Sequence, residues 1–135
     1  MSHKIEGSYL GGLRVSSTHL ASNTEIFTDA PLDNNGKGES FSPTDLVATA
    51  LGTCMITVMG IYAEQNGILM PNVYSRTNKF MTSNPRKIST LKIEIIFDDN
   101  QLSDVDKQSL KEVALNCPVA KSLHPDLQQE IEFIF

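Results

Sequence analysis

The two cysteines are the residues of this sequence best suited to chemistry. Cys54 and Cys117 are its only cysteines. A thiolate is a strong nucleophile, and two thiols that meet can be oxidised to a disulfide and reduced again, so the pair is a candidate redox couple. Two cysteines in a reducing compartment can also be buried thiols or metal ligands. The cysteine count alone leaves these alternatives open.

The local sequence makes the two cysteines different. Cys54 lies in an apolar stretch, with Leu51 and Val58 at helical spacing, which is typical of a small core residue. An apolar setting disfavours a thiolate, so a reactive Cys54 requires a cation from elsewhere in the fold. Cys117 precedes Pro118, where free N–H groups and the positive end of a following helical turn favour a thiolate. The alternative for Cys117 is a core residue that closes the preceding helix.

No other group of residues forms a comparable motif. The histidines His3, His19 and His124 are scattered and have no zinc-ligand spacing relative to the cysteines, so no metal site is expected. Threonines recur every four residues along the stretch that carries Cys54, and their hydroxyls can bond back to helix carbonyls. No Gly-rich phosphate motif and no Ser-His-Asp arrangement is legible.

The composition is that of one ordinary globular domain. The chain has 135 residues, of which 40% are hydrophobic, and a formal net charge of -5. This length supports one hydrophobic core and predicts a single domain over 1–135. The negative charge argues against a nucleic-acid partner, which requires clustered Lys and Arg.

Two features predict a location in the cytoplasm. The N-terminus has no apolar core of signal-peptide length. The uncharged stretch 46–63 approaches the length of a membrane span, but it contains threonines and glycines and is bordered by Asp45 and Glu64, as a buried core helix would be. We therefore expect no membrane partner.

The elements that must position the cysteines begin with strands. Alternating residues and turn signals predict an antiparallel meander with three strands, at 5–10, 13–20 and 24–29. A polar, Gly-rich loop follows over 31–42, and loops of this length in small domains are often functional.

A long helix is expected to carry Cys54. Ser42 is a suitable N-cap, Pro43 suits the first helical position, and Asp45 completes a capping box. The helix is predicted to run to Asn66, because Gly67 is a natural C-cap.

The second half of the chain adds a hairpin, a helix and a last strand. Strands are expected at 73–82 and 88–97, and a helix capped by Ser103 follows them. Cys117 would be the N-cap of a further helical turn over 118–123. The alternating residues 130–135 predict a final strand, and the fold class is therefore α+β.

The segments SPTDLVATALGTCMITVMGIYAEQNG and NCPVAKSL together resemble the OsmC/Ohr superfamily. The resemblance spans most of the chain, from the opening strands ending in TDAP to the closing strand. It implies an OsmC-like fold in which antiparallel sheets wrap around a long central Cys-bearing helix. It also implies an intertwined homodimer with two sites at the subunit interface.

The resemblance further implies a thiol-dependent peroxidase. Cys54 would attack the peroxide and become a sulfenic acid, and Cys117 would close it into a disulfide. No cofactor is implied, and the expected reductant is an external small dithiol or a lipoyl-type dithiol. A wall that suits organic hydroperoxides would be formed by three apolar residues of the Cys54 helix, Val47, Leu51 and Ile61.

The resemblance also implies an arginine that activates the first cysteine. In the peroxidases it comes from the N-terminal region and is held by a Glu, but that position is Thr44 here, followed directly by Asp45. Arg14 is the first candidate for the arginine, and Arg76 and Arg86 are the alternatives.

Three functions follow as hypotheses. The first is thiol-dependent reduction of hydroperoxides, preferably organic ones, in defence against oxidative stress. The second is non-catalytic binding of an apolar small molecule, with both cysteines as packing residues, and the third is a redox sensor. A homodimer has separate support, because the Cys54 helix is apolar nearly all round and needs cover on more than one face.

Overall fold

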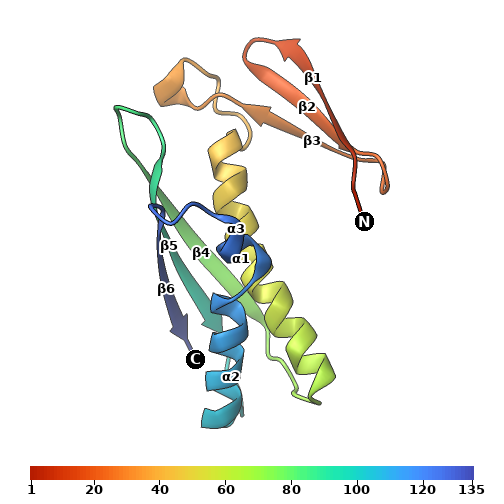
Figure 1. The fold of residues 1–135 in the computed structure, drawn as a ribbon, viewed down its shortest axis with the longest axis vertical. Coiled ribbons are helices and arrows are strands. Elements are labelled where there is room, and N and C mark those ends of the chain that lie inside the picture. The colour runs from red at the N-terminus through yellow and green to blue at the C-terminus, as the bar shows by residue number, and fades with distance from the viewer. The chain divides into compact units, whose positions relative to one another are not determined.

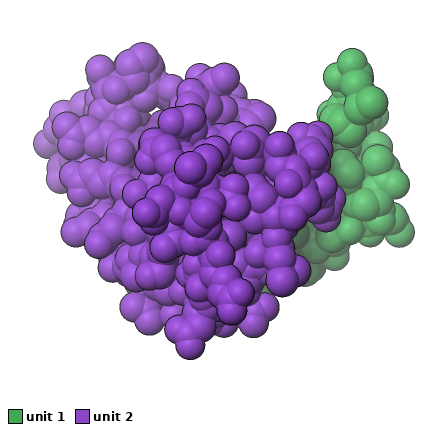
Figure 2. Space-filling model, turned by 90° about the horizontal axis from the view of Figure 1, so that it is seen from below, with its two compact units in different colours: residues 1–46 green, residues 47–135 purple.

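The structure is a computed structural model that describes residues 1–135, and its elements follow one another as labelled in Figure 1. The chain divides into two compact units, Met1–Leu46 and Val47–Phe135, which Figure 2 colours green and purple. We describe each unit separately. The single domain expected over 1–135 stays a prediction.

The N-terminal unit is the expected antiparallel meander. Its strands are β1 (Ile5–Gly11), β2 (Arg14–His19) and β3 (Thr24–Asp29), paired in that order. The β1–β2 turn needs left-handed backbone at Gly11, Gly12 and Leu13, and two glycines supply most of it. The predicted strand ends are correct to within one residue.

The loop after β3 contains an element that the sequence analysis did not predict. The short 3-10 helix η1 covers Leu32–Asn34 and ends at Asn35, which has a left-handed φ of 64°. The loop is also packed closely on itself. A Cβ at Gly36 would lie 1.7 Å from the carbonyl oxygen of Ala30, so only glycine fits there.

The helix α1 (Pro43–Gln65) begins at the predicted capping box. The Ser42 N–H donates to an Asp45 carboxylate oxygen at 2.9 Å, and the Asp45 N–H donates to Ser42 Oγ at 3.1 Å. The helix ends one residue before the predicted Asn66. Gly67 has a left-handed φ of 64°, and the following Ile68 N–H closes the end on a helix carbonyl.

The C-terminal unit contains a three-stranded sheet of β4 (Val73–Met81), β5 (Ile88–Phe97) and β6 (Gln128–Ile134). The β4–β5 pair is antiparallel, but β5 and β6 are parallel, so the expectation of antiparallel sheets is wrong for this pair. The chain between them runs through two helices, α2 (Asp104–Leu115) and α3 (Pro118–Ser122). A crossover connection of this kind allows β6 to run in the same direction as β5.

One hydrophobic core joins α1, α2 and the sheet. Alternate residues of β5 are fully or nearly fully buried, as expected for a strand with one face on a core. Residues of α1 at spacings of three and four face the same cluster, as do two residues of α2. The members of this cluster on the three elements are Ala48, Leu51, Met55, Met59, Ala63, Leu91, Ile93, Ile95, Phe97, Leu110 and Ala114.

The length and composition of α1 would also allow it to cross a membrane, with a mean hydropathy of 1.8. This is weak evidence, because the core helix of a soluble protein passes the same test. The buried residues of α1 lie on one side of the helix, as in a core helix. Only 33% of its most apolar 18-residue segment is buried inside the single chain. The absence of a membrane partner stays an expectation.

Candidate active site

The two thiols belong to different helices of the C-terminal unit. Cys54 is half-buried in the middle of α1, and Cys117 is 1% exposed just before α3. Both are free thiols, and both pack in the same hydrophobic cluster. The two side chains are close enough that Cys54 contributes to raising the pKa of the Cys117 thiol. The structure therefore brings together the two residues that the sequence analysis singled out.

The local sequence explains the position of Cys117. Its backbone is extended, with φ -65° and ψ 154°, and Pro118 occupies the first helical position, where its missing N–H costs nothing. The Cys117 Sγ accepts a hydrogen bond from the Ala120 N–H at 3.4 Å. Cys117 is thus the predicted N-cap of α3, with sulfur in place of the usual side-chain oxygen.

The electrostatics of Cys117 differ from the expectation. The predicted N–H donors are present, and the Ala120 N–H does lower the pKa of the thiol. Burial nevertheless outweighs them and raises the pKa of Cys117 above its ordinary value, and hydrogen bonding to Cys54 and the charge of Cys54 raise it further. The expectation that this junction favours a thiolate is therefore wrong in sign.

This arrangement favours the neutral form of Cys117. Loss of the Cys117 proton would leave a negative charge in a buried, apolar position beside Cys54, which is unfavourable. Cys54 is also the more exposed of the two and can be reached by a solute. The roles of the two thiols as attacking and resolving groups stay a prediction.

Arg14 is held by two carboxylates within the N-terminal unit. Its Nε and Nη2 donate to the two carboxylate oxygens of Asp29 at 2.7 and 2.8 Å, and Nη2 also donates to Glu39 at 3.0 Å. Asp29 is 1% exposed and also accepts the Glu39 N–H at 3.1 Å. The guanidinium lowers the pKa of Asp29, which therefore stays ionised.

The sequence analysis did not identify Asp29 or Glu39. Asp29 could have been found from the sequence. A turn at residues 22–23 sets the register of β2 and β3, and in this register Arg14 is the cross-strand partner of Asp29. Glu39 could not be found in this way. It reaches Arg14 only because the loop after β3 folds back, and no residue pattern predicts that path.

The alternative arginines are both exposed. The guanidinium of Arg76 on β4 lies 6.0 Å from the ring centroid of Tyr74, and Arg86 lies in the β4–β5 turn. Asp45 closes the capping box of α1, and the Thr44 hydroxyl lies 3.2 Å from that of Ser42. Whether any of these residues acts on Cys54 stays a prediction.

The three residues expected to form an apolar wall have different surroundings. Leu51 is fully buried in the core, Val47 is half-buried, and Ile61 is 49% exposed. Ile61 is therefore the most available to a ligand in the single chain. The substrate-binding role of the three residues stays a prediction.

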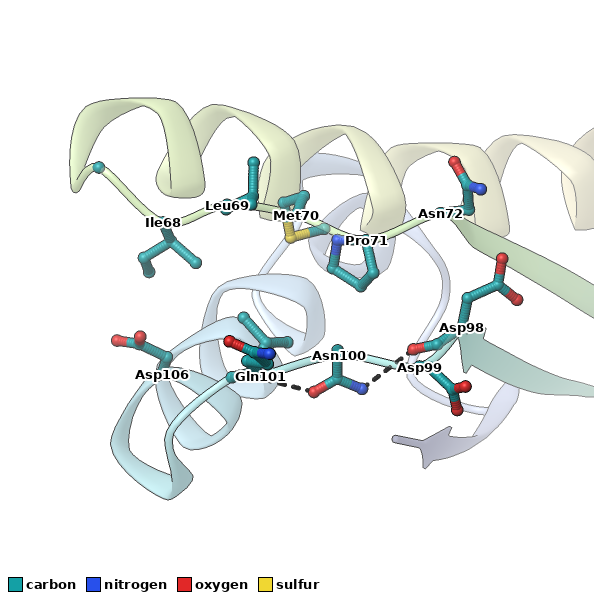
Figure 3. A pocket seen from close by; sticks show the side chains of 12 residues that line it. Ile68, Leu69, Met70, Pro71, Asn72, Asp98, Asp99, Asn100, Gln101 and Asp106 are labelled. Atoms are coloured by element: carbon teal, nitrogen blue, oxygen red, sulfur yellow. Dashed lines mark hydrogen bonds between the residues drawn. The ribbon is translucent and has the colours of Figure 1, made fainter.

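A surface hollow of about 820 Å³ lies elsewhere in the C-terminal unit (Figure 3). It is lined by the α1–β4 loop, including Met70 and Asn72, and by the β5–α2 loop, where the Asn100 amide donates to the Asp98 carbonyl. Neither cysteine lines it. No group of three or more His, Cys, Asp or Glu side chains could hold a metal ion.

The sequence matches a family model described as OsmC-like protein over residues 36–132. That range contains both cysteines, the end of the Gly-rich loop and all of α1. No curated protein matches the sequence.

Solved structures of similar proteins match almost the whole chain. A Psychrobacter arcticus protein, named for osmotic stress induction and detoxification response, is 45% identical and has a TM-score of 0.91, with 98% of this chain and 96% of that chain covered. The organic hydroperoxide resistance protein OsmC of Legionella pneumophila has a TM-score of 0.76 at 15% identity, with 100% and 98% covered.

A third relative belongs to the hydroperoxide resistance group by name. The organic hydroperoxide resistance protein OhrB of Bacillus subtilis has a TM-score of 0.70 at 17% identity, with 98% of each chain covered. At such identities the last two matches show a shared fold alone. The α+β fold class expected from the sequence is confirmed by them.

Proposed function

Because the chain belongs to the OsmC-like protein family of the OsmC/Ohr superfamily, we propose that it reduces hydroperoxides through Cys54 and Cys117, with organic hydroperoxides preferred. The role in the cell would be defence against oxidative stress. The observation that carries this proposal is the thiol pair itself: a half-buried Cys54 beside a buried Cys117 whose pKa is raised.

The first step would be attack of the Cys54 thiolate on the peroxide. An S–O bond forms as the O–O bond breaks, the sulfur is oxidised to a sulfenic acid, and the alkoxide takes a proton and leaves as an alcohol. A neutral Cys117 thiol beside the thiolate does not compete for the peroxide. Arg14 is the proposed cation that stabilises the Cys54 thiolate, and Asp45 at the start of α1 is a candidate for the carboxylate that holds this arginine in place of the Glu.

The second step would be closure of the disulfide. The Cys117 sulfur attacks the Cys54 sulfur, an S–S bond forms, and the sulfenic oxygen leaves as water with the Cys117 proton. An external small dithiol or lipoyl-type dithiol would then reduce the disulfide and leave as its own disulfide. No cofactor takes part in this scheme.

The proposal is tested by titrating reduced protein with cumene hydroperoxide and with hydrogen peroxide. We expect one peroxide to be consumed for each Cys54–Cys117 disulfide, and cumene hydroperoxide to react faster. Mass spectrometry of the digested protein identifies the disulfide. Folded, fully reduced protein that consumes neither peroxide would refute the proposal.

The binding alternative is distinguished by removing both thiols. An apolar ligand that binds equally well to wild type and to the double variant Cys54→Ala, Cys117→Ala would favour a non-catalytic role. A redox sensor would form the disulfide once without turnover in the presence of a dithiol.

We further propose that the functional form is a homodimer. The face of α1 around Cys54 carries small and apolar residues that are half-buried or exposed, namely Ala50, Thr53, Thr57 and Ile61. The Thr53 and Thr57 hydroxyls donate to helix carbonyls at 2.9 and 2.8 Å, which leaves their methyl groups for packing. A second copy of α1 is the occupant that best fits this face.

The proposed location is the cytoplasm. Both cysteines are free, and free thiols persist in a reducing compartment. A dithiol reductant for the proposed cycle would also be supplied there. Fractionation of cells that express the protein tests this part of the proposal.

A further inference from the structure

The inference concerns Gln129, a polar residue on the inner face of β6. Side chains alternate along this strand, and Ile131 and Phe133 on its inner face pack against the hydrophobic core. Gln129 lies on the same face and is half-buried, whereas the residues between these three are exposed. An apolar residue would be expected there. An amide in such a position needs a hydrogen-bond partner.

The partner of Gln129 is the carbonyl of Ala120 on α3. Gln129 Nε2 donates to this oxygen at 3.0 Å, and the contact is partly buried. In a longer helix the carbonyl would accept the N–H four residues further on. The helix α3 cannot supply that donor, because the backbone of Leu123 is already extended, with ψ 150°. The side chain from β6 therefore replaces a missing helical donor.

The same alanine holds the sulfur of Cys117. The Ala120 N–H donates to Cys117 Sγ at 3.4 Å. The helix α3 has five residues, and a helix this short is not stable through its own hydrogen bonds. Its place depends on apolar contacts of Val119 and Leu123 with the core and on the bond from Gln129. Of these contacts, the bond from Gln129 acts directly on the residue that holds the sulfur.

We propose that Gln129 is a positioning residue that, through Ala120, holds the sulfur of Cys117 for closure of the disulfide. This inference rests on the proposed function, because closure is its second step. In that step the Cys117 sulfur attacks the Cys54 sulfur, an S–S bond forms, and the sulfenic oxygen leaves as water with the Cys117 proton. All of these residues belong to the C-terminal unit.

The first test measures the two steps separately after one equivalent of cumene hydroperoxide. Gln129→Met keeps the length of the side chain but removes the N–H donor. We expect it to slow disulfide closure about tenfold, the factor that corresponds to loss of one hydrogen bond. Formation of the sulfenic acid, trapped with dimedone, should keep its wild-type rate. Gln128→Met, at the exposed neighbouring position, should change neither rate. Unchanged closure in folded Gln129→Met, or an equal loss in both steps, would overturn the inference.

A second test separates positioning from a general loosening of α3. The Ala120 N–H lowers the pKa of the Cys117 thiol, against the larger effect of burial. Cys54, the titratable group that acts on this thiol, is removed in a Cys54→Ser background. The difference in ultraviolet absorbance from a protein with both cysteines changed to Ser then reports the Cys117 thiolate. We expect Gln129→Met to move its titration to higher pH. A titration that moved to lower pH would mean that the thiol has only become hydrated, and this result or an unchanged titration would overturn the inference.

Gln129→Glu keeps the tests decisive if Gln129→Met does not fold. Glutamate has nearly the same size, but an ionised carboxylate cannot donate to a carbonyl, so we expect a loss at least as large. A wild-type rate of closure in Gln129→Glu would show that the hydrogen bond has no role. Failure of the proposed function is distinguishable, because wild-type protein would then consume no peroxide. The titration of Cys117 needs no peroxide and would still show whether Gln129 positions the sulfur.

Discussion

At the scale of single residues, the main asymmetry is between the two thiols. Cys117 is buried, accepts an N–H from Ala120 and has a raised pKa, whereas Cys54 is partly exposed on α1. A neutral, enclosed thiol is a poor first nucleophile, but it is well placed to attack a neighbouring sulfenic acid. Within the proposed function, we therefore assign the attack to Cys54 and the closure of the disulfide to Cys117.

We expect Cys117→Ser to stop the cycle after its first step. Without a resolving thiol, the peroxide should convert Cys54 to a sulfenic acid that persists long enough to be trapped with dimedone. Mass spectrometry would detect the adduct on the peptide that contains Cys54. The matched variant Cys54→Ser should give no adduct. If Cys117 in the Cys54→Ser variant were labelled as fast as Cys54 is in the Cys117→Ser variant, the assignment of the two roles would be wrong.

The raised pKa of Cys117 predicts a dependence of stability on pH. Below the ordinary thiol pKa of about 8.5, both folded and unfolded chains carry the proton and the stabilisation is complete. Above it, the unfolded chain loses the proton first, so the free energy of unfolding falls until the pH passes the raised pKa.

Urea unfolding under reducing conditions measures this effect. Wild type should lose stability relative to Cys117→Ala as the pH rises above about 8.5. Parallel curves for the two proteins would mean that burial does not hold the proton on Cys117.

The sequence could predict part of the site at this scale. The order Asn116, Cys117, Pro118 is sufficient to predict an N-cap, because it depends on residues next to one another. The degree of burial of Cys117 depends on how α1, α2 and the sheet pack together, which no local pattern contains. That is why the expected activation of Cys117 has the wrong sign.

At the scale of elements, α1 depends on a close approach to β4. Gly52 is buried, and a Cβ there would meet Ser75 Oγ and Thr77 Oγ1, each at 3.4 Å. These two hydroxyls lie on the strand face that meets the helix. The distance leaves room for one methyl group in tight contact, but not for a larger side chain.

Gly52→Leu should therefore destabilise the protein, whereas Gly52→Ala should be tolerated. Leucine would push α1 away from β4, and overpacking of a core costs about 1–3 kcal/mol. Alanine gains up to about 1 kcal/mol in helix propensity over glycine, which offsets a tight contact. Thermal unfolding of the two variants gives the comparison. A Gly52→Leu protein as stable as wild type would show that α1 does not pack closely on β4.

Local signals predicted most elements, and the exceptions have a common cause. β5 was predicted with correct ends because Leu91, Ile93, Ile95 and Phe97 alternate along it. The parallel pairing of β6 could not be read in the same way. The direction of β6 relative to β5 depends on how the chain runs through α2 and α3, and the residues of the two strands do not determine it.

At the scale of the whole molecule, the chain leaves much apolar surface uncovered. All seven residues of β1 are exposed, and the N-terminal unit presents several large apolar side chains to solvent. These side chains include Ile5, Tyr9, Leu10, Leu13, Ile26 and Phe27. A soluble monomer rarely exposes so much apolar surface, and a partner chain would cover it. The same argument applies to the exposed face of α1.

Gly60 on α1 offers a sharp test of the proposed homodimer. A Cβ at this position would meet nothing within 4 Å in the single chain. Within a monomer, Gly60→Leu should therefore be harmless, and it should even stabilise α1 because leucine has the higher helix propensity. In a dimer whose two α1 helices pack together through this face, the added side chain would be inserted twice, once from each copy.

We expect Gly60→Leu to weaken the dimer without unfolding the subunit. At about 1–3 kcal/mol for each overpacked side chain, the dissociation constant should rise at least about tenfold. Light scattering would report the shift toward the mass of one chain, 14.9 kDa. Gln108→Leu, on an exposed position of α2, controls for added apolar surface. If the Gly60→Leu dimer were as tight as wild type, the two α1 helices would not pack against each other at Gly60, because a close helix contact has no room for two added leucines.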